Sequence, residues 1–383
     1  MAELSLSDRA LQAVREGRFA EGAALYAEHL AGGRRDPGAA ANCAIALRRL
    51  RRWEEGLRIL EPYRGETLPA VPYTLGHLYS GLRRWPEAVD AFREAARLQT
   101  SPDLDLSLAR ALLALGDYEE GFRLFESRVD VPGFPARRLQ TPGVAEWRGE
   151  DLTGRSILVW MEQGLGDQIQ FARFLPQLRG AARVGVACHS AVAPLLAPLA
   201  DEVFARDKPF AARGYHYWTL SMSLPRHFGT RRETVPPAPY LRTPQAYRAK
   251  WRGKVPEKVG VVWQANPKNP DGPLRSLPSP DLLDPLREVA TVVDLQAPRG
   301  DLADMAAILE QLDLLVSVDT APAHLAGALG LPAWVMLADV SDWRWGEGEA
   351  TPWYPSLRLF RGRWEEMIAK MAAELAERAP TGG

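Results

Sequence analysis

The chain has 383 residues, of which 46% are hydrophobic and 25% charged, and this composition excludes wholesale disorder. Its 47 Lys and Arg nearly balance its 48 Asp and Glu, so the protein has no overall basic surface for nucleic acid. Two cysteines exclude a disulfide framework and a cysteine-built zinc site. Because there is no apolar run of about 18 residues and no signal-peptide pattern at the start, we expect no transmembrane segment and a cytoplasmic location.

The first third of the chain repeats itself with a period near 34 residues. Phe19, Trp53, Trp85 and Tyr118 each follow a short turn, at spacings of 34, 32 and 33. Three positions later comes a small residue, and seven positions later a large apolar one: Gly22, Gly56, Ala88 and Gly121, then Tyr26, Leu60, Phe92 and Phe125. A small residue lets a paired helix approach, and the large one fills the gap. The pattern is typical of tetratricopeptide repeats and predicts an α-helical solenoid of about four repeats over residues 1–130, with a plain helical bundle as the alternative.

Solenoids of this kind present a concave surface that holds peptides or partner proteins. The repeats would recruit a partner, or would only buttress the rest of the chain. Arginine clusters at 48–52 and 83–84 precede the turns between helices, and we interpret them as solvated turn residues.

After a Pro-, Gly- and Arg-rich connection at 131–150, strand and helix signals alternate. We predict strands at 156–163 and 183–188 and helices at 167–178 and near 190–199, then a Pro-rich hinge at 231–245. Strands at 258–265, 291–296, 314–320 and 332–337 and helices at 301–313 and 321–330 follow. The alternation predicts two Rossmann-like α/β domains, residues 151–245 and 246–362, which face a cleft at the carboxyl ends of their strands. Residues 363–383 are predicted to form a closing helix and a tail.

Four segments place candidate functional residues beside that cleft. In the first, Gly164-Leu165-Gly166-Asp167 follows a strand and opens a helix. The glycines allow close approach of a ligand to the backbone, and Asp167 would act as a general base or would simply cap the helix. In the second, Asp319-Thr320-Ala321 ends a strand and begins a helix whose free N–H groups would hold a diphosphate. His324 would reach the ligand or would pack against the sheet.

The third segment is a loop with Lys268, Arg275 and Ser276, whose cations and hydroxyl suit a phosphate clamp, although solvated charges on a stiff loop explain them equally well. The fourth is Asp342-Trp343-Arg344-Trp345 with Trp353-Tyr354. These aromatic residues would stack a base or sugar, or would pin the last helix to the core.

Together the stretches ILVWMEQGLGDQIQFARFLP, VGVVWQANP, RSLP, LDLLVSVDTAPAHLAGALGLPAWVML and DWRWGEGEATPWYPSLRLF resemble bacterial tetratricopeptide-repeat glycosyltransferases. The catalytic half, about residues 145–365, is similar to the heptosyltransferase family of the two-domain GT-B fold. The chain departs from the family pattern after Trp263, where it has Gln264-Ala265-Asn266-Pro267, and in the loop that follows.

The resemblance implies an inverting, metal-independent transfer of a sugar from a nucleotide-diphospho-sugar to an acceptor hydroxyl, with no cofactor. It implies that Asp167 is the base and that Asp319, Thr320 and His324 hold the donor. The resemblance and the segments together nominate the donor-binding set Gly164, Gly166, Lys268, Arg275, Ser276, Asp319, Thr320, Ala321 and His324, with Gln163, Trp263, Asn266, Gln296 and Trp343 as candidate contacts. A protein acceptor bound by the repeats completes the expectation. An inactive scaffold, which the altered 264–274 loop suggests, and transfer to a lipid-linked glycan are the alternatives.

Overall fold

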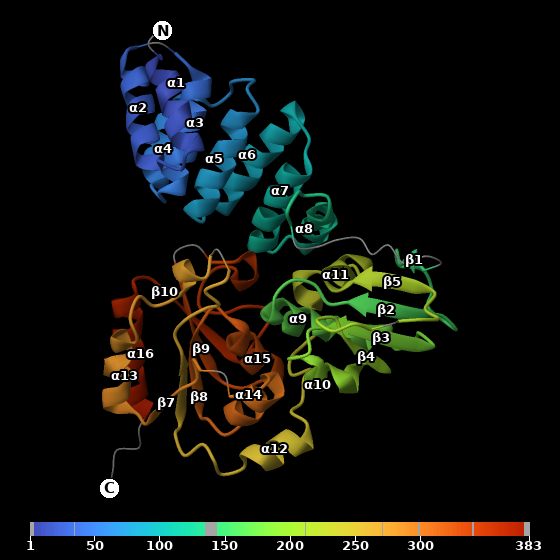
Figure 1. Ribbon diagram of the computed structural model, residues 1–383. Coiled ribbons are helices and arrows are strands. Elements are labelled where there is room, and N and C mark those ends of the chain that lie inside the picture. Colours follow the sequence, from blue (N-terminus) through green and yellow to red (C-terminus); the bar gives the residue numbers. More distant parts are fainter. Residues whose placement is uncertain are drawn as a thin grey trace. The chain divides into compact units, whose positions relative to one another are not determined.

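The computed structural model describes residues 4–33, 35–134, 144–210, 212–269, 271–297, 299–338 and 341–378. The chain divides into two compact units, Met1–Phe134 and Pro135–Gly383. Residues 135–143 of the predicted connection, 379–383 of the predicted tail and Pro270 of the 264–274 loop lie outside the described residues. Figure 1 shows helices alone in the first unit, and helices and two sheets in the second.

The described part of the first unit is a row of paired α-helices. Their bounds are α1 Leu6–Arg15, α2 Phe19–Ala31, α3 Pro37–Arg49, α4 Trp53–Leu60, α5 Ala70–Gly81, α6 Trp85–Leu98, α7 Pro102–Leu115 and α8 Tyr118–Phe125. The four aromatic residues that reveal the repeat are the first residues of α2, α4, α6 and α8. Short polar residues delimit the helices: the Ser101 side chain accepts a hydrogen bond from Leu104 N, and Gly116 ends α7 with a left-handed φ of 90°.

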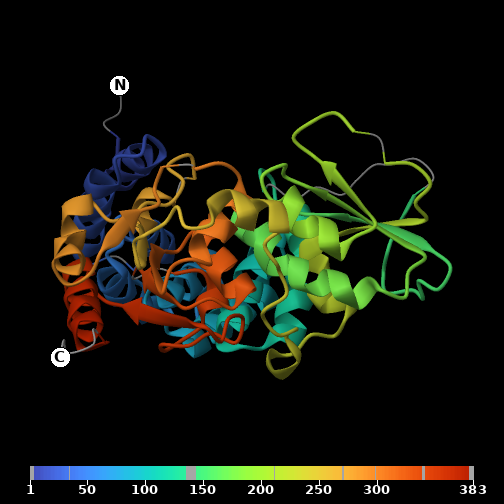
Figure 2. The same ribbon diagram turned by 90° about the horizontal axis from the view of Figure 1, so that it is seen from below.

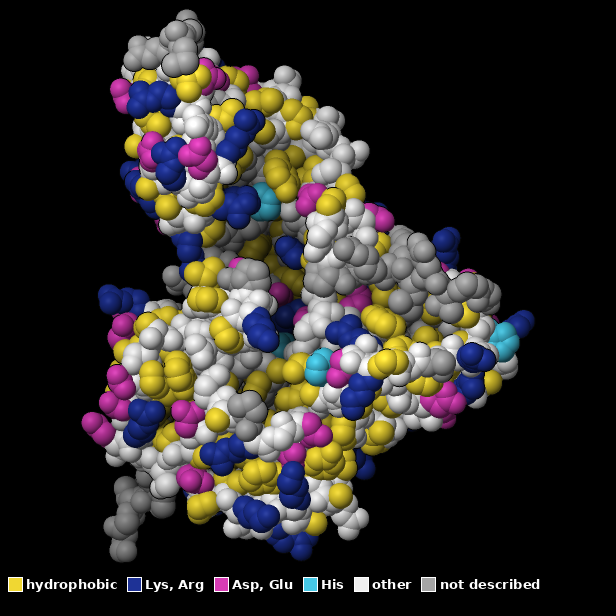
Figure 3. Space-filling model, in the orientation of Figure 1, with side chains coloured by type: hydrophobic (Ala, Val, Ile, Leu, Met, Phe, Trp, Pro, Cys, Tyr) yellow, Lys and Arg dark blue, Asp and Glu magenta, His cyan; other side chains and the backbone are white. Residues whose placement is uncertain are grey.

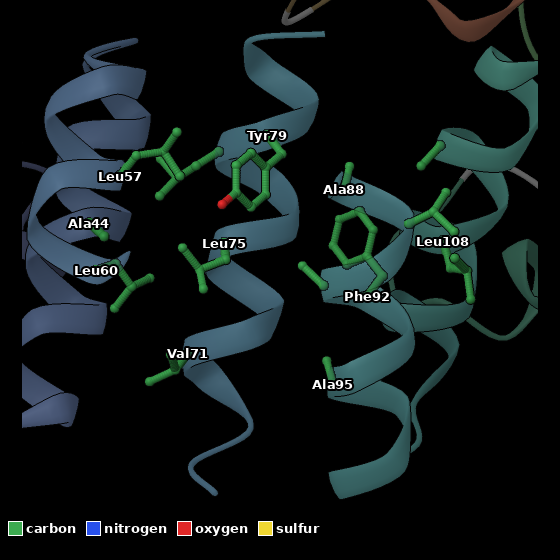
Figure 4. Packing of buried hydrophobic residues seen from close by; sticks show 14 of the residues in the cluster. Ala44, Leu57, Leu60, Val71, Leu75, Tyr79, Ala88, Phe92, Ala95 and Leu108 are labelled. Carbon is green, nitrogen blue, oxygen red and sulfur yellow. The ribbon is translucent and has the colours of Figure 1, made fainter. Parts of the chain in front are cut away.

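The small residues of the repeat are where neighbouring helices touch. A Cβ atom on Gly56 would lie 2.6 Å from Leu78 Cδ2, and one on Gly22 would lie 2.5 Å from Val14 Cγ2. The large residues fill the space between pairs: Phe92 and Leu60 are 1% and 0% exposed. Figure 4 shows Leu75 and Tyr79 of α5 between Leu57 and Leu60 of α4 and Phe92 of α6. The predicted tetratricopeptide-type solenoid is therefore confirmed.

The second unit contains two sheets in which, among the described residues, all pairings of named strands are parallel. The first sheet has the order β1-β5-β2-β3-β4, with β1 Ala145–Glu146, β2 Ser156–Trp160, β3 Arg183–Cys188, β4 Glu202–Ala205 and β5 Tyr217–Leu220. The second has the order β10-β9-β8-β6-β7, with β6 Val259–Val262, β7 Val292–Asp294, β8 Leu314–Val318, β9 Ala333–Leu337 and β10 Leu357–Arg361. This confirms the predicted fold class, a helical solenoid followed by two Rossmann-like α/β domains of the GT-B kind.

Helices cover these sheets. They are α9 Leu165–Phe171, α10 Ala193–Leu196, α11 Leu224–His227, α12 Gln245–Trp251, α13 Asp284–Val289, α14 Leu302–Leu309, α15 Ala321–Leu329 and α16 Trp364–Arg378. The closing helix α16 packs Met367, Ile368 and Met371 onto the second sheet. In Figures 1 and 2, α9 and α15 lie between the two sheets, and these helices contact each other.

Two parts of the second unit differ from the sequence prediction. The first sheet begins inside the segment predicted as a connection: Ala145 N donates to His216 O, and Trp147, 4% exposed, donates through its indole to Glu150 O. The strands β4, β5 and β10 were not predicted, because each is only four or five residues long. The segment after α11 contacts both halves of the unit, since Tyr240 donates from its amide to Ala328 O and from its hydroxyl to Ile169 O.

Candidate functional site

The glycine turn after β2 positions Asp167 at the start of α9. Gly164 is the N-cap, and its N–H donates to Asp167 Oδ2 at 3.0 Å. The chain enters this turn through Gln163, whose φ of 53° is left-handed and whose carbonyl accepts a hydrogen bond from Arg206 at 2.7 Å. The Gln163 amide group donates to Met222 Sδ. Asp167 therefore does cap the helix, as one of the two interpretations expected, and the turn holds its carboxylate in one orientation.

The other oxygen of Asp167 bonds to Arg344, to which the sequence analysis assigned no role of its own within the aromatic segment. Arg344 Nη2 donates to Asp167 Oδ1 at 2.6 Å, and the two side chains are 9% and 16% exposed. Arg344 lies in the short 3-10 helix Trp343–Trp345, which Asp342 caps by accepting from Arg344 N. This ion pair joins the first α/β domain to the second.

The junction between β8 and α15 supplies the second part of the site. Asp319 is 3% exposed, and its Oδ2 accepts from Arg275 Nη1 at 3.3 Å. Thr320 is the N-cap of α15 in an extended conformation, but its side chain makes no capping hydrogen bond. Pro322 has no N–H, and Ala323 N donates to Thr320 O at 3.0 Å, so the first turn of α15 offers the Ala321 amide to an anion next to Arg275.

His324 lies one turn into α15 and is buried, with 2% of its surface exposed. Its Nδ1 is 3.0 Å from the hydroxyl of Tyr354, its Nε2 is 3.9 Å from Asp319 Oδ1, and its ring centroid is 5.0 Å from that of Trp345. A Cβ atom on Gly166 would lie 2.7 Å from His324 Cδ2. Gly166 thus serves the close approach of α9 to α15, and His324 packs between the domains.

Burial and charge act together on the ionisable groups of this site. Burial raises the pKa of Asp167, and Arg344 partly opposes that rise. Burial likewise raises the pKa of Asp319, against the effect of Arg275. The pKa of His324 is lowered well below its usual value by burial and by Arg344, so the ring is neutral. Burial alone would lower the pKa of Arg344, but Asp342, Asp167 and Asp319 raise it. Asp167 thus combines a raised pKa with an ion pair to a guanidinium that stays charged.

Of the residues predicted on the 264–276 loop, some contact the site around Asp319 and others face solvent. Arg275 reaches Asp319, whereas Lys268 is exposed on the loop. Ser276 holds the loop together, because its hydroxyl accepts from Ala265 N and donates to Gly272 O. The remaining candidates contact their own strand ends rather than the Asp167 site: Asn266 Oδ1 accepts from Lys268 N, Trp263 Nε1 donates to Asp294 Oδ2, and Gln296 pairs with the backbone of Gln264.

The aromatic residues near the chain end are part of the interior. Trp353 and Tyr354 are 1% and 0% exposed, and the guanidinium of Arg173 lies 5.0 Å and 4.9 Å from their ring centroids. Arg173 also donates to Pro236 O. The structure supports the packing interpretation in a modified form, because these rings fix the first α/β domain to the second rather than pinning the last helix. Trp343 is 6% exposed and lies beneath Arg344, with 5.5 Å between the Arg344 guanidinium carbon and the ring centroid.

Neither a metal cluster nor a membrane-spanning helix is present among the described residues. No group of three or more His, Cys, Asp or Glu side chains could hold a metal ion, and no helix in the described ranges is long and apolar enough to cross a membrane.

Part of the α/β unit matches a known protein family. Residues 284–374, which include Asp319, His324 and Arg344, match the model of glycosyltransferase family 9 (heptosyltransferase). The resemblance to the heptosyltransferase-like family is confirmed over this segment. The chain is also 30% identical to protein FlbA of Caulobacter vibrioides over 351 residues, 76% of this chain and 59% of that protein. It thus spans about 59% of the length of this curated relative.

Solved structures with similar folds include a glycosyl transferase family 9 protein from Veillonella parvula, with 12% identity, a TM-score of 0.41, and coverage of 61% of this chain and 93% of that one. Heptosyltransferase II from E. coli matches with 14% identity and a TM-score of 0.40, covering 58% of this chain and 99% of that chain. An O-GlcNAc transferase from Thermobaculum terrenum matches with 13% identity and a TM-score of 0.37, covering 100% of this chain and 92% of that chain.

Proposed function

We propose that the α/β unit transfers a sugar from a nucleotide-diphospho-sugar to an acceptor hydroxyl, with inversion and without a metal. One observation carries the proposal. The family 9 match spans the β8–α15 junction and Arg344. In the structure Arg344 donates to Asp167 of the other α/β domain, and His324 of α15 packs against Gly166 of the same turn. A potential base and a potential diphosphate site are thus brought together from two domains, as a transfer between two substrates requires.

On the donor side, three features suit a leaving diphosphate. The N-terminus of α15 has no side-chain cap on its first amides. Burial raises the pKa of Asp319, just before that helix, and the positive charges of Arg275 and Arg344 both oppose that rise. The Ala321 N–H at the start of α15 and two guanidinium groups would stabilise the negative charge that the leaving group gains, which is the role that a metal ion has in other transferases.

On the acceptor side, Asp167 would take the proton of the attacking hydroxyl. Its carboxylate accepts hydrogen bonds from Gly164 N and Arg344. We infer that Arg344 turns from Asp167 to the donor diphosphate, because a diphosphate offers a guanidinium more negative charge than one carboxylate does. The exchange would release the base when the donor is in place.

Donor binding is the first measurement. The full chain is titrated with UDP, GDP, ADP, CMP and their sugars, and its unfolding temperature is recorded beside that of Asp319→Ala. We expect one nucleotide class to give a saturable increase that weakens in the variant, because a ligand that binds only the native state stabilises it. Failure of every nucleotide to stabilise a well-folded sample would overturn the proposal.

A specific observation favours a second candidate, a binding scaffold without transfer activity. Both Asp167 oxygens are engaged, and the Ser276 hydroxyl ties the 264–274 loop to itself through Ala265 N and Gly272 O. A scaffold would bind its partner through the helical unit and show neither nucleotide binding nor sugar transfer. The nucleotide titration therefore separates the two candidates.

We further propose that the helical unit recruits a protein acceptor and that the protein acts in the cytoplasm. The solenoid architecture supports the first statement, because such stacks present a continuous surface for a polypeptide. A pull-down with purified candidate acceptors, compared with a lipid-linked glycan, tests it. Retention of the glycan alone would contradict a protein acceptor.

A further inference from the structure

A row of buried polar side chains runs from the aromatic segment of the second α/β domain to the start of α15. The Tyr354 hydroxyl lies 3.0 Å from His324 Nδ1, and His324 Nε2 lies 3.9 Å from Asp319 Oδ1. Asp319 in turn accepts a hydrogen bond from Arg275. On the face of the α/β unit that Figure 3 shows, charged and hydrophobic side chains are interspersed. The row is therefore recognised from its interior contacts and not from that surface.

Packing fixes the position of the Tyr354 hydroxyl. A Cβ atom on Gly327 of α15 would collide with the Tyr354 ring, so the ring lies directly on the helix, about one turn after His324. The guanidinium carbon of Arg173 lies 4.9 Å from the centroid of the Tyr354 ring. The imidazole of His324 lies beside the Trp345 ring at an interplanar angle of 30°. Because both rings are enclosed in this way, the contact between hydroxyl and imidazole is a fixed feature of the interior.

Two arrangements of protons satisfy the contact between Tyr354 and His324. The imidazole is neutral, because burial lowers the pKa of His324 well below its usual value, so one ring nitrogen carries a proton and the other a lone pair. In one arrangement Nδ1–H donates to the hydroxyl, and Tyr354 passes its own proton to the neighbouring Tyr240 hydroxyl. In the other, the Tyr354 hydroxyl donates to Nδ1, and the imidazole proton is on Nε2.

The position of Asp319 favours the second arrangement. With the proton on Nδ1, the lone pair of Nε2 would face the Asp319 carboxylate and repel it. With the proton on Nε2, an N–H group faces the carboxylate and attracts it. This attraction acts on Asp319 Oδ1, whereas Arg275 holds Oδ2. The two oxygens are then held from two sides.

We propose that Tyr354 is a positioning residue for the donor site, whose hydroxyl donates to His324 Nδ1 and so keeps the imidazole proton on Nε2, facing Asp319. Tyr354 acts through His324, and His324 keeps the Asp319 carboxylate beside Arg275 at the start of α15. The expected effect on donor binding rests on the proposed function. The arrangement of protons does not depend on it.

The arrangement of protons is tested by NMR on the full chain without any nucleotide. Two-dimensional ¹H–¹⁵N correlation of protein with ¹⁵N-labelled histidine distinguishes Nε2–H from Nδ1–H, and the His324 signals are those missing from His324→Gln. We expect Nε2–H in the parent chain. Tyr354→Phe removes only the hydroxyl and should move the Nδ1 resonance toward that of a nitrogen without a hydrogen bond. A proton on Nδ1 in the parent chain would overturn the proposal, even if Tyr354→Phe does not fold.

The matched control is Tyr215→Phe. It removes another buried tyrosine hydroxyl, which donates to Glu202 in the first sheet, and it should leave the His324 signals unchanged. An Nδ1 resonance of His324 that stays in place in Tyr354→Phe would also contradict the proposed hydrogen bond.

The consequence for the donor site is measured with the nucleoside diphosphate, among UDP, GDP and ADP, that stabilises the parent chain. Tyr354→Phe should weaken its binding roughly three- to tenfold, as expected for the loss of one hydrogen bond, and Tyr215→Phe should not. In the His324→Gln background, Tyr354→Phe should cause no further loss, because no imidazole is left to orient. An equal loss in both backgrounds would show a purely structural role and overturn the proposal. If no nucleotide binds, the proposed function fails, whereas the NMR spectra still decide the arrangement of protons.

Discussion

Asp167 and Arg344 illustrate what a single pair of residues contributes at this site. The pair is separated by 177 positions in the sequence and joins two domains at 2.6 Å. Replacing only one member of a buried ion pair strongly destabilises the folded protein, because the remaining charge is left without its partner. Function and stability are therefore coupled at this pair, and the two effects have to be measured separately.

Asp167→Asn tests the proposed base. The amide keeps the size of the side chain but is not a base, so transfer should fall roughly 10²–10⁴-fold, while the nucleotide still raises the unfolding temperature. Product formation and thermal shift are measured on the same sample. Unchanged turnover would eliminate this role for Asp167.

A double-mutant cycle measures the pair itself. Arg344→Gln alone should lower the free energy of unfolding by ~3–5 kcal/mol, because Asp167 becomes a buried carboxylate without its cation. The double variant Asp167→Asn/Arg344→Gln should be more stable than the sum of the two single changes predicts. Urea unfolding at neutral pH gives the four free energies. Strict additivity would show that the two groups do not interact in the folded protein.

The lowered pKa of His77, caused mainly by desolvation, predicts how the stability of the folded chain depends on pH. Its pKa is lowered to about 3 in the folded chain, against about 6.5 when unfolded, so the unfolded chain binds more protons between these values. Stability should therefore decrease as the pH falls from about 6.5 toward 3, and His77→Gln should lose less than the parent. Because His77 is partly exposed, we expect a difference of roughly 1–2 kcal/mol between about pH 7 and about pH 4. Parallel curves for the two proteins would contradict this.

At the scale of elements, helix contacts in the solenoid depend on small residues. A Cβ atom on Gly76 of α5 would lie 2.5–2.9 Å from the Phe92 ring, which is itself buried. Gly76→Ala should therefore cost about 1–3 kcal/mol, because the ring and its helix must move apart. Gly38→Ala is the matched control, since the nearest neighbouring atom there is a side-chain oxygen at 3.4 Å and alanine favours the helix. Urea unfolding compares the two, and an equal effect of both would argue against tight packing at Gly76.

The elements were predicted where a pattern repeats or a buried strand is long. The four repeated aromatic residues coincide with the first residues of α2, α4, α6 and α8, and the run RVGVAC coincides with β3. Edge strands such as β4 were not predicted, because they are short and half-buried.

The role of Arg344 was not predicted for another reason. Its segment attracted notice for its tryptophans, and nothing local to it shows that Asp167 would be its partner. Distant charge pairs depend on the tertiary fold, which a single sequence does not reveal.

At the scale of the whole molecule, each unit contains a large hydrophobic cluster built from its own described residues. One large cluster extends from Ala40 to Leu112, and another from Val259 to Ala372. In calorimetry of the full chain, a bound nucleotide should therefore raise the unfolding temperature of the α/β unit alone, by an amount equivalent to about 2.7 kcal/mol at 100 Kd. Gly76→Ala should lower the transition of the helical unit alone. A single transition that moves as one in both experiments would contradict this expectation.

The bond between Arg344 and Asp167 has a kinetic consequence. While Arg344 donates to Asp167, the carboxylate carries a strong hydrogen bond where a proton would have to arrive. An acceptor that binds before the donor would find the Asp167 carboxylate still hydrogen-bonded to Arg344. The proposed transferase would therefore follow a compulsory order, with donor first and acceptor second. In steady state, the nucleoside diphosphate product would then compete with the donor and be noncompetitive with the acceptor.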